Sequence, residues 1–387
     1  MVEDFGYNYS QFAAAGFPLH AFVHPRFNRS GPLSEDLSPT FQIHVYWIEG
    51  GLLLSVAYHH AFSDAECARM FLEAFAAQTR HETIQLPRDC VLTLPETPMT
   101  EPKDFETLAK KEFTDYALLP DKSGPLNIVL SPGGADFSGF PSFTGTVFEI
   151  EDAKIKELSQ SIHNYAQGRL IKPPSSYVCL AALTWAFVVK ARMEAEQDKY
   201  CPENEHGGES RMLNNVNFRS KIPDESGDYW GDAAAALSSY MALPDLIRCC
   251  DGDLEKLTDV VETITATIET VDRDYVLRLR DLYAAAGDPR RLGFKWDPRT
   301  PQNIGFTTWR YAGADSEWNI PGVFSVDRKP DAITPASPTW AANPYGLILP
   351  AKSGATIHKL FLGIPKISME ALKKDKTWMG WVSRVAE

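Results

Sequence analysis

Two apolar runs near the start of the chain predict a β-hairpin. The stretches 41–49 (FQIHVYWIE) and 52–58 (LLLSVAY) are rich in β-branched, aromatic and leucine residues, and Gly50 and Gly51 separate them. Short runs of this kind around a glycine turn are typical of paired strands. Because the second run is apolar at almost every position, we expect it to be buried on both faces.

A helical pattern follows the hairpin after a short interval. Between residues 68 and 75, apolar side chains recur at the i, i+3, i+4 and i+7 positions that share one face of a helix. Just upstream, Ser63 and Glu66 fit the Ser-x-x-Glu capping box. A helix is therefore predicted to begin at about Asp64, with Ser63 or Asp64 as its N-cap.

The rest of the chain predicts a larger α/β part. A strand followed by a helix is expected over 143–166, with Asp152 as the helix cap. The apolar run 177–189 predicts a buried helix and is too short to cross a bilayer. Residues 253–287 have helical periodicity that stops at a glycine. Residues 86–125 are rich in proline and charge, with little periodicity, and predict a linker or crossover segment.

Composition narrows the class of protein. At 387 residues, 44% of them hydrophobic, the chain is long for a single core and predicts two domains. We place an N-terminal domain at 1–95, a crossover segment at 96–142 and a C-terminal domain at 143–387. The net charge of −13 argues against nucleic acid or an anionic membrane as a partner, because both would need a basic face.

The cysteines indicate a reducing compartment. None of the six is spaced as C-x-x-C, and the adjacent Cys249 and Cys250 are poor disulfide partners for each other. No signal peptide pattern opens the chain. We therefore expect reduced thiols, a cytoplasmic location and no metal site.

Two adjacent histidines, His59 and His60, lie between the predicted strand and the predicted helix. A histidine at the end of a strand is usually a satisfied core residue, and Asp64 could be no more than a helix cap. This interpretation leaves unexplained why two titratable rings end so apolar a strand. A neutral imidazole with a pKa near 7 would also suit general-base chemistry.

Five segments in the same order resemble one family. HHAFSDA (59–65) is similar to the His-His-x-x-x-Asp-Gly signature of CoA-dependent acyltransferases of the chloramphenicol acetyltransferase-like superfamily, with Ala65 in place of the glycine. Segments 174–192, 214–233, 306–322 and 346–375 resemble the BAHD acyltransferases of that superfamily. Fungal members such as the trichothecene acetyltransferases look closest.

Two of these segments carry particular motifs. Segment 214–233 resembles the family's Asp/Asn-x-Arg stretch, which is followed by a proline, an aromatic residue and Gly-Asn. Segment 306–322 lies where the family has Ser-Trp and then Asp-Phe-Gly-Trp-Gly, and it keeps Asp315, Trp318 and Gly322 in altered spacing.

The resemblance implies a fold and a reaction. The fold would be α/β, with two chloramphenicol acetyltransferase-like domains, each a mixed sheet with flanking helices, and an active-site tunnel between them. The protein would move an acyl group, acetyl by family analogy, from acyl-CoA to a hydroxyl or amine of a small hydrophobic secondary metabolite. Acyl-CoA would be a co-substrate, no cofactor would be bound permanently, and the protein would be a monomer.

The resemblance also assigns roles around the signature. His60 would be the general base that activates the acceptor for direct attack, with no covalent acyl-enzyme. Asp64 would point away from the substrate and pair with Arg219, which fixes the loop that carries His60. Cys67 has no evident base and is interpreted as a core residue.

Donors for the developing oxyanion, or residues of the tunnel, are suggested by family position at Trp318, Thr307 and Thr308. The CoA phosphates need local cations on so acidic a protein. The basic island at 168–176 lies beside a family segment, whereas a second one at 288–296 does not. The candidate CoA-binding residues are Arg169, Lys172, Ser175 and Ser176.

Two further expectations stay open. The same fold could bind a hydrophobic metabolite and catalyse an isomerisation or cyclisation, or only carry it, without acyl transfer. The signature also lies only 59 residues into the chain, whereas the family has more strands and a helix ahead of it. We therefore expect strand 52–58 to lack sheet neighbours and to expose apolar surface, and an upstream exon or another chain to supply the missing layer.

Overall fold

The computed structural model describes residues 6–22, 41–60, 62–84, 104–118, 142–196, 208–222, 229–288, 291–296, 300–323, 327–336 and 344–386. All of the candidate site residues fall within these ranges. Cys90 and Cys201 lie outside the described residues, and the four described cysteines are free thiols.

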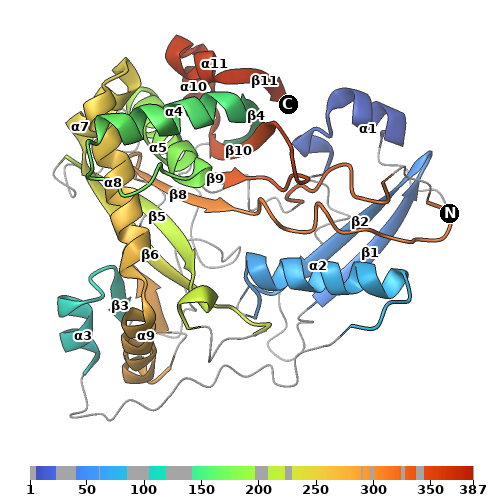
Figure 1. Ribbon diagram of the computed structural model, residues 1–387, viewed down its shortest axis with the longest axis horizontal. Coiled ribbons are helices and arrows are strands. Elements are labelled where there is room, and N and C mark those ends of the chain that lie inside the picture. Colours follow the sequence, from blue (N-terminus) through green and yellow to red (C-terminus); the bar gives the residue numbers. More distant parts are fainter. Residues whose placement is uncertain are drawn as a thin grey trace.

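A seven-stranded mixed sheet organises the larger part of the molecule (Figure 1). Its strands, in spatial order, are β11 (Val382–Ala386), β4 (Phe143–Glu151), β10 (Ile357–Pro365), β9 (Tyr345–Ile348), β8 (Asn303–Thr308), β5 (Glu209–Asn217) and β6 (Ala234–Ala242). The β5–β8 and β8–β9 pairs are parallel and the others are antiparallel. The carboxyl end of β5 leads directly to Arg219.

Helices cover one face of this sheet and enclose the main core. They are α4 (Asp152–Tyr165), α5 (Ser176–Glu196), α7 (Leu243–Arg248), the short 3₁₀ turn η3 (Cys249–Asp251), α8 (Leu254–Thr270), α10 (Lys366–Lys374) and α11 (Lys376–Trp381). The predicted apolar helix is α5, which is buried along almost its whole length, as expected for a helix that is apolar on every side. None of the described helices is long and apolar enough to span a membrane.

A second core lies on the other side of β5 and β6. It contains α3 (Phe105–Lys111), β3 (Tyr116–Leu118), α9 (Arg273–Ala286) and β7 (Leu292–Phe294), with β3 and β7 paired as a two-stranded sheet. The expected crossover segment is therefore not a plain linker, because α3 and β3 lie within it. The helical stretch 253–287 is two helices, because Asp272 caps α9 by accepting a hydrogen bond from the Tyr275 amide at 2.7 Å.

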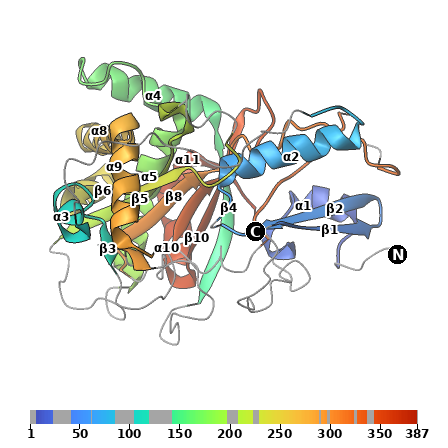
Figure 2. The same ribbon diagram turned by 90° about the horizontal axis from the view of Figure 1, so that it is seen from below.

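The smaller N-terminal part contains the predicted hairpin (Figure 2). Its elements are α1 (Tyr9–Ala15), the 3₁₀ turn η1 (Leu19–Ala21), β1 (Phe41–Ile48), β2 (Gly51–Tyr58) and α2 (Ala65–Thr79). In both views α2 runs along the hairpin with its first turn directed toward the large sheet. The turn that precedes this helix therefore lies where the two parts of the molecule meet.

The expected burial of β2 on both faces is wrong. Most of its residues are only partly buried, and β1 is its sole partner among the described strands. One face of the hairpin packs Tyr46 and Ile48 against α1, whereas Ile43, Val45 and Trp47 on the other face are 37%, 51% and 38% exposed. A two-stranded sheet buries little on its own, which explains the half-exposed pattern.

Two predicted caps also differ in detail. The N-cap of α2 is Asp64, one of the two predicted candidates, but the predicted capping box is not formed, because Glu66 binds Arg69 and not the backbone at Ser63. The N-cap of α4 is Glu151, while Asp152 forms ion pairs with other residues. Glu66 has a local partner three residues on, whereas Asp152 also binds His358, which is distant in the sequence.

Candidate active site

His60 lies in the turn between β2 and α2. The backbone amides of Phe62 and Ser63 donate to the carbonyl oxygen of His59 at 2.9 and 3.3 Å, which closes this turn. The side chain of His60 is 60% exposed. Its ring is thus held on a hydrogen-bonded turn at the junction of the two domains, with most of its surface open to an incoming molecule.

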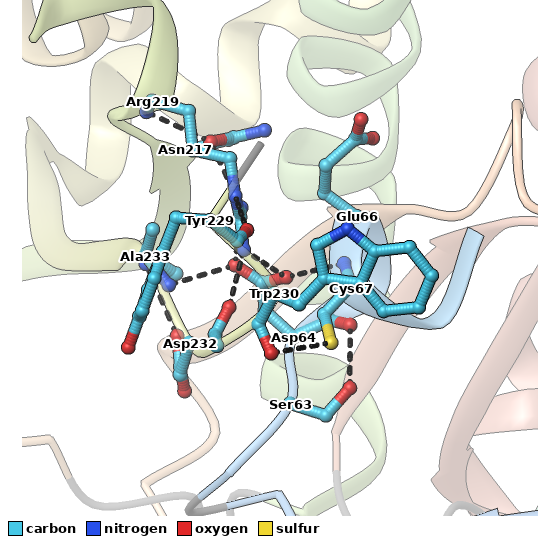
Figure 3. Close-up of polar contacts among 12 residues, drawn as sticks. Ser63, Asp64, Glu66, Cys67, Asn217, Arg219, Tyr229, Trp230, Asp232 and Ala233 are labelled. Carbon is cyan, nitrogen blue, oxygen red and sulfur yellow. Dashed lines mark hydrogen bonds and ion pairs between the residues drawn. The ribbon is translucent and has the colours of Figure 1, made fainter. Parts of the chain in front are cut away.

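The Asp64 side chain is buried in a cluster of polar contacts with Arg219, Cys67 and Ala233 (Figure 3). Its Oδ1 accepts from the Cys67 amide at 2.8 Å and caps α2, while its two oxygens accept from Arg219 at 2.7 and 3.0 Å. The amide of Ala233 also donates to Oδ2 at 2.9 Å. One carboxylate therefore joins the start of α2 to two backbone segments of the C-terminal domain.

Arg219 occupies the 3₁₀ turn η2 (Arg219–Lys221), which follows β5. Besides binding Asp64, its guanidinium donates to the carbonyl oxygens of Tyr229 at 3.1 Å and of Gly231, and to the side chain of Asn217 at 3.2 Å. The planar guanidinium suits this arrangement because its five donors point in fixed directions. Arg219 thus holds the segment 229–233 against the signature turn.

This ion pair is buried, with side-chain exposures of 9% for Arg219 and 7% for Asp64. Removing both charges from water is costly, and the cost is offset only where the remaining donors and acceptors are satisfied. Here the carboxylate receives hydrogen bonds at both oxygens and the guanidinium donates on each side. The sequence-predicted pair is therefore in direct contact, and it holds the two domains together at the site.

Asp232 is a site residue that the sequence did not single out. Its Oδ2 lies 3.6 Å from Nδ1 of His60, an ion-pair distance that is longer than a hydrogen bond. The Asp232 carboxylate raises the pKa of His60 above its ordinary value, an effect that partial desolvation of the ring by the surrounding protein opposes. The only sequence signal was its place in the Gly-Asp dipeptide after the aromatic residues 229–230, where the family pattern has Gly-Asn.

Gly231 is required by a close approach within the same segment. A Cβ atom at this position would overlap the side chain of Tyr229, whose ring also stacks under the Arg219 guanidinium at 5.8 Å. Glycine allows the Tyr229 ring to pack this closely beside the backbone whose carbonyl faces the arginine.

Cys67 has the environment of a core residue. Its thiol is buried on the first turn of α2 and donates to the Trp230 carbonyl oxygen at 3.2 Å (Figure 3). Burial raises the pKa of the Cys67 thiol, which disfavours the nucleophilic thiolate. No group of three or more His, Cys, Asp or Glu side chains in the described part of the chain is arranged to hold a metal ion.

The suggested oxyanion donors lie in two places. Thr307 and Thr308 are half-buried at the end of β8, and the Thr308 hydroxyl accepts from the Arg310 amide at 3.1 Å. Trp318 packs edge-on against Phe75 of α2, with ring centroids 5.4 Å apart. Phe75 is about 16 Å along the helix axis from Asp64, at 1.5 Å per residue. The structure therefore does not bring Trp318 to the signature turn.

The suggested CoA-binding residues lie between α4 and the start of α5. Arg169 forms ion pairs with Asp259 and Glu262 of α8 at 3.3 and 3.1 Å, so its charge is already opposed by two carboxylates. By contrast, Lys172 is exposed. The hydroxyl of Ser175 accepts weakly from an amide of α5 at 3.4 Å, and Ser176 is the first residue of that helix.

The fold and this junction define a two-domain α/β transferase scaffold. A family model described as "Transferase family" matches residues 30–378. The chain therefore belongs to the Transferase family, which is the family of the BAHD acyltransferases. A search of curated protein sequences returned no significant match.

Solved structures share the scaffold at low sequence identity. TRI101 of F. graminearum, complexed with coenzyme A and T-2 mycotoxin, has a TM-score of 0.72 at 16% identity, covering 98% of this chain and 79% of that one. TRI101 of F. sporotrichioides, complexed with coenzyme A and T-2, has a TM-score of 0.69 at 16% identity, and the match covers 98% of this chain and 79% of that one. Vinorine synthase has a TM-score of 0.53 at 15% identity, and the match covers 92% of this chain and 68% of that one. These matches confirm the expected two-domain α/β fold.

Proposed function

We propose that this protein transfers an acyl group from acyl-CoA to a hydroxyl or amine of a small hydrophobic metabolite, with His60 as the general base. The observation that carries the proposal is the exposed imidazole of His60 on a turn that the buried Asp64–Arg219 pair fixes at the domain junction. Membership of the acyltransferase family supports the same reaction.

The proposed step uses one imidazole and no covalent intermediate. Nε2 of His60 takes the proton of the acceptor as its oxygen or nitrogen attacks the thioester carbonyl. The tetrahedral intermediate collapses, the carbon–sulfur bond breaks, and the CoA thiolate receives the proton from Nε2. The products are the acylated acceptor and free CoA, and His60 returns to its starting state.

We propose acetyl as the acyl group, with T-2 mycotoxin and deoxynivalenol as the first acceptors to try. Solved structures of the similar TRI101 proteins, which hold coenzyme A with one or the other of these compounds, support this choice. The acceptors that are turned over will show whether oxygen or nitrogen is acylated.

The direct test is thiol release from acetyl-CoA in the presence of a panel of hydroxylated and amine metabolites. General-base catalysis contributes about 10²- to 10⁴-fold, so His60→Ala should lose about that much in kcat. Because His60 is 60% exposed, the melting temperature should stay close to that of the wild type. Wild-type turnover in His60→Ala would disprove its assignment as the base.

His59→Ala is the matched control. His59 is the neighbouring, less exposed histidine whose carbonyl closes the turn, and we expect its replacement to lower stability more than chemistry. If the wild type releases no thiol with any acceptor and does not retain CoA on purification, acyl transfer itself would be refuted, and the same fold would be serving an isomerisation, a cyclisation or transport.

A further inference from the structure

The Nδ1 atom of His60 faces a carboxylate that is anchored on its other side. Oδ2 of Asp232 lies 3.6 Å from Nδ1, and Oδ1 accepts a hydrogen bond from the Ala234 amide at 3.1 Å. We propose that Asp232 is the positioning residue of the site: it holds the proton of His60 on Nδ1 and leaves Nε2 free to act as the base.

The position of Asp232 follows from the buried Asp64–Arg219 ion pair. Arg219 binds the carbonyl oxygens of Tyr229 and Gly231, and the amide of Ala233, two residues after Gly231, donates to Asp64. Residues on both sides of Asp232 are therefore fixed to the same ion pair that fixes the turn carrying His60 (Figure 3). The Asp64–Arg219 pair therefore sets the distance between the Asp232 carboxylate and the His60 imidazole.

Such a carboxylate has two effects on a histidine. It favours the tautomer protonated at Nδ1, and it stabilises the imidazolium that forms when Nε2 accepts a proton. This inference rests on the proposed function only where it concerns rate, because the tautomer and the titration of His60 are properties of the free protein. At 3.6 Å the contact has room to shorten when the ring becomes charged.

In the described part of the chain, the charged groups that act on His60 are Asp232 and Asp64, the latter bound to Arg219. Asp232 raises the pKa of His60 most strongly, a hydrogen bond with the backbone of His60 itself and the charge of Asp64 add to this, and partial desolvation of the ring lowers it. The active base is the neutral ring, so activity is lost as the pH falls through this pKa. Removing the charge of Asp232 should lower the pKa and move the acidic limb of the pH–rate profile to lower pH.

The test compares the full-length wild type with Asp232→Asn. Asparagine keeps an oxygen that can accept from the Ala234 amide, so the fold should be retained. Two-bond ¹H–¹⁵N spectra of ¹⁵N-histidine-labelled protein, with His60 assigned by His60→Gln, report the tautomer and the titration midpoint directly. We expect a predominantly Nδ1-protonated ring in the wild type, and a mixed tautomer with a lower midpoint in Asp232→Asn.

In the acetyl-CoA assay, kcat should fall about 10- to 100-fold in Asp232→Asn. This is less than the roughly 10⁴-fold loss known where such a carboxylate is buried, because Asp232 is 33% exposed. Asp232→Glu, which keeps the charge, should recover part of the loss.

Glu66→Gln is the matched control. It removes one negative charge from the first turn of α2, where Glu66 binds Arg69 and its carboxylate points away from Asp232 (Figure 3). A His60 midpoint and tautomer that are the same in Asp232→Asn as in Glu66→Gln and the wild type would overturn the inference. A shifted midpoint in a protein that transfers no acyl group would uphold the role of Asp232 and refute the proposed function instead.

Discussion

At the scale of single residues, the Asp64 carboxylate has several partners at the junction at once. It accepts from the backbone of α2, from both terminal nitrogens of Arg219 and from the backbone of Ala233. One carboxylate thus caps a helix, pairs with a buried charge and contacts the backbone of the other domain. A change at Asp64 leaves Arg219 buried without its counter-charge, which is more costly than losing an exposed ion pair.

We therefore predict that Asp64→Ala and Arg219→Ala each destabilise the protein by about 3–5 kcal/mol. The double variant should be no less stable than the poorer single one, because the second change removes a charge that the first left unpaired. Urea unfolding of the four proteins measures this. Strictly additive losses would contradict the coupling.

Arg69→Ala provides the comparison for an exposed pair. Arg69 binds Glu66 and Glu73 on the surface of α2, with 27% of its side chain exposed. Exposed pairs contribute about 0–1 kcal/mol, so this variant should lose far less than either partner of the buried pair.

At the scale of elements, the segment 229–233 leads into β6 and supplies the site with carbonyls, an amide and Asp232. Its course depends on Gly231, where the backbone passes close to the Tyr229 ring. Because this segment positions Asp232 and contacts the base of α2 through Cys67, displacing it should disturb catalysis as well as stability.

Gly231→Ala should accordingly lower the free energy of unfolding by about 1–3 kcal/mol, the usual cost of overpacking, and reduce kcat. Gly380→Ala in α11 is the control, because a Cβ atom there meets nothing within 4 Å. Thermal unfolding and acetyl-CoA turnover should separate the two. Equal behaviour of both variants would show that the close contact with Tyr229 does not constrain the segment.

At the scale of the whole molecule, the charge of −13 opposes an anionic co-substrate. Phosphate groups of CoA must then meet local cations. Arg169 is engaged by two carboxylates of α8, whereas Lys172 is exposed a few residues away. Of the two, Lys172 is the better placed to receive a phosphate without breaking an existing pair.

Lys172→Glu should raise KM for acetyl-CoA about three- to tenfold with little change in kcat, as expected for one reversed surface charge at a binding site. Arg169→Gln should leave KM nearly unchanged and slightly lower the melting temperature, because its pairs with α8 are lost. Steady-state kinetics at low salt measures the first effect. An unchanged KM in Lys172→Glu would remove the basic island at 168–176 from the CoA site.

Local sequence was sufficient for several elements. The glycine-separated hairpin, the start of α2 near Asp64 and the fully apolar α5 each follow from contacts within a few residues or from the burial of a whole apolar segment. The order of the family's motifs along the chain also predicted the two-domain fold, which the solved structures confirm. The pairing of Asp64 with Arg219 also came from that resemblance and not from the local pattern.

The local sequence could not show which of several possible packing, hydrogen-bond or ion-pair partners a residue takes in the folded protein. β2 is as apolar as a core strand, yet its burial depends on how many strands and helices surround it. Asp152 and Arg169 each had a reasonable local role, and each is bound instead to a side chain about 90 or more positions away. A charged side chain has several possible partners of similar interaction energy, and tertiary packing decides which of them comes within reach.

The sequence by itself therefore determined the helices and strands whose hydrogen bonds and apolar faces are local, together with the residue types available for chemistry. The tertiary structure alone decided which of these residues meet. The Asp64–Arg219 contact spans 155 positions and the Asp64–Ala233 contact spans 169. Only the closed domain junction supplies the burial that makes these contacts strong, and only there does the backbone place Asp232 beside His60.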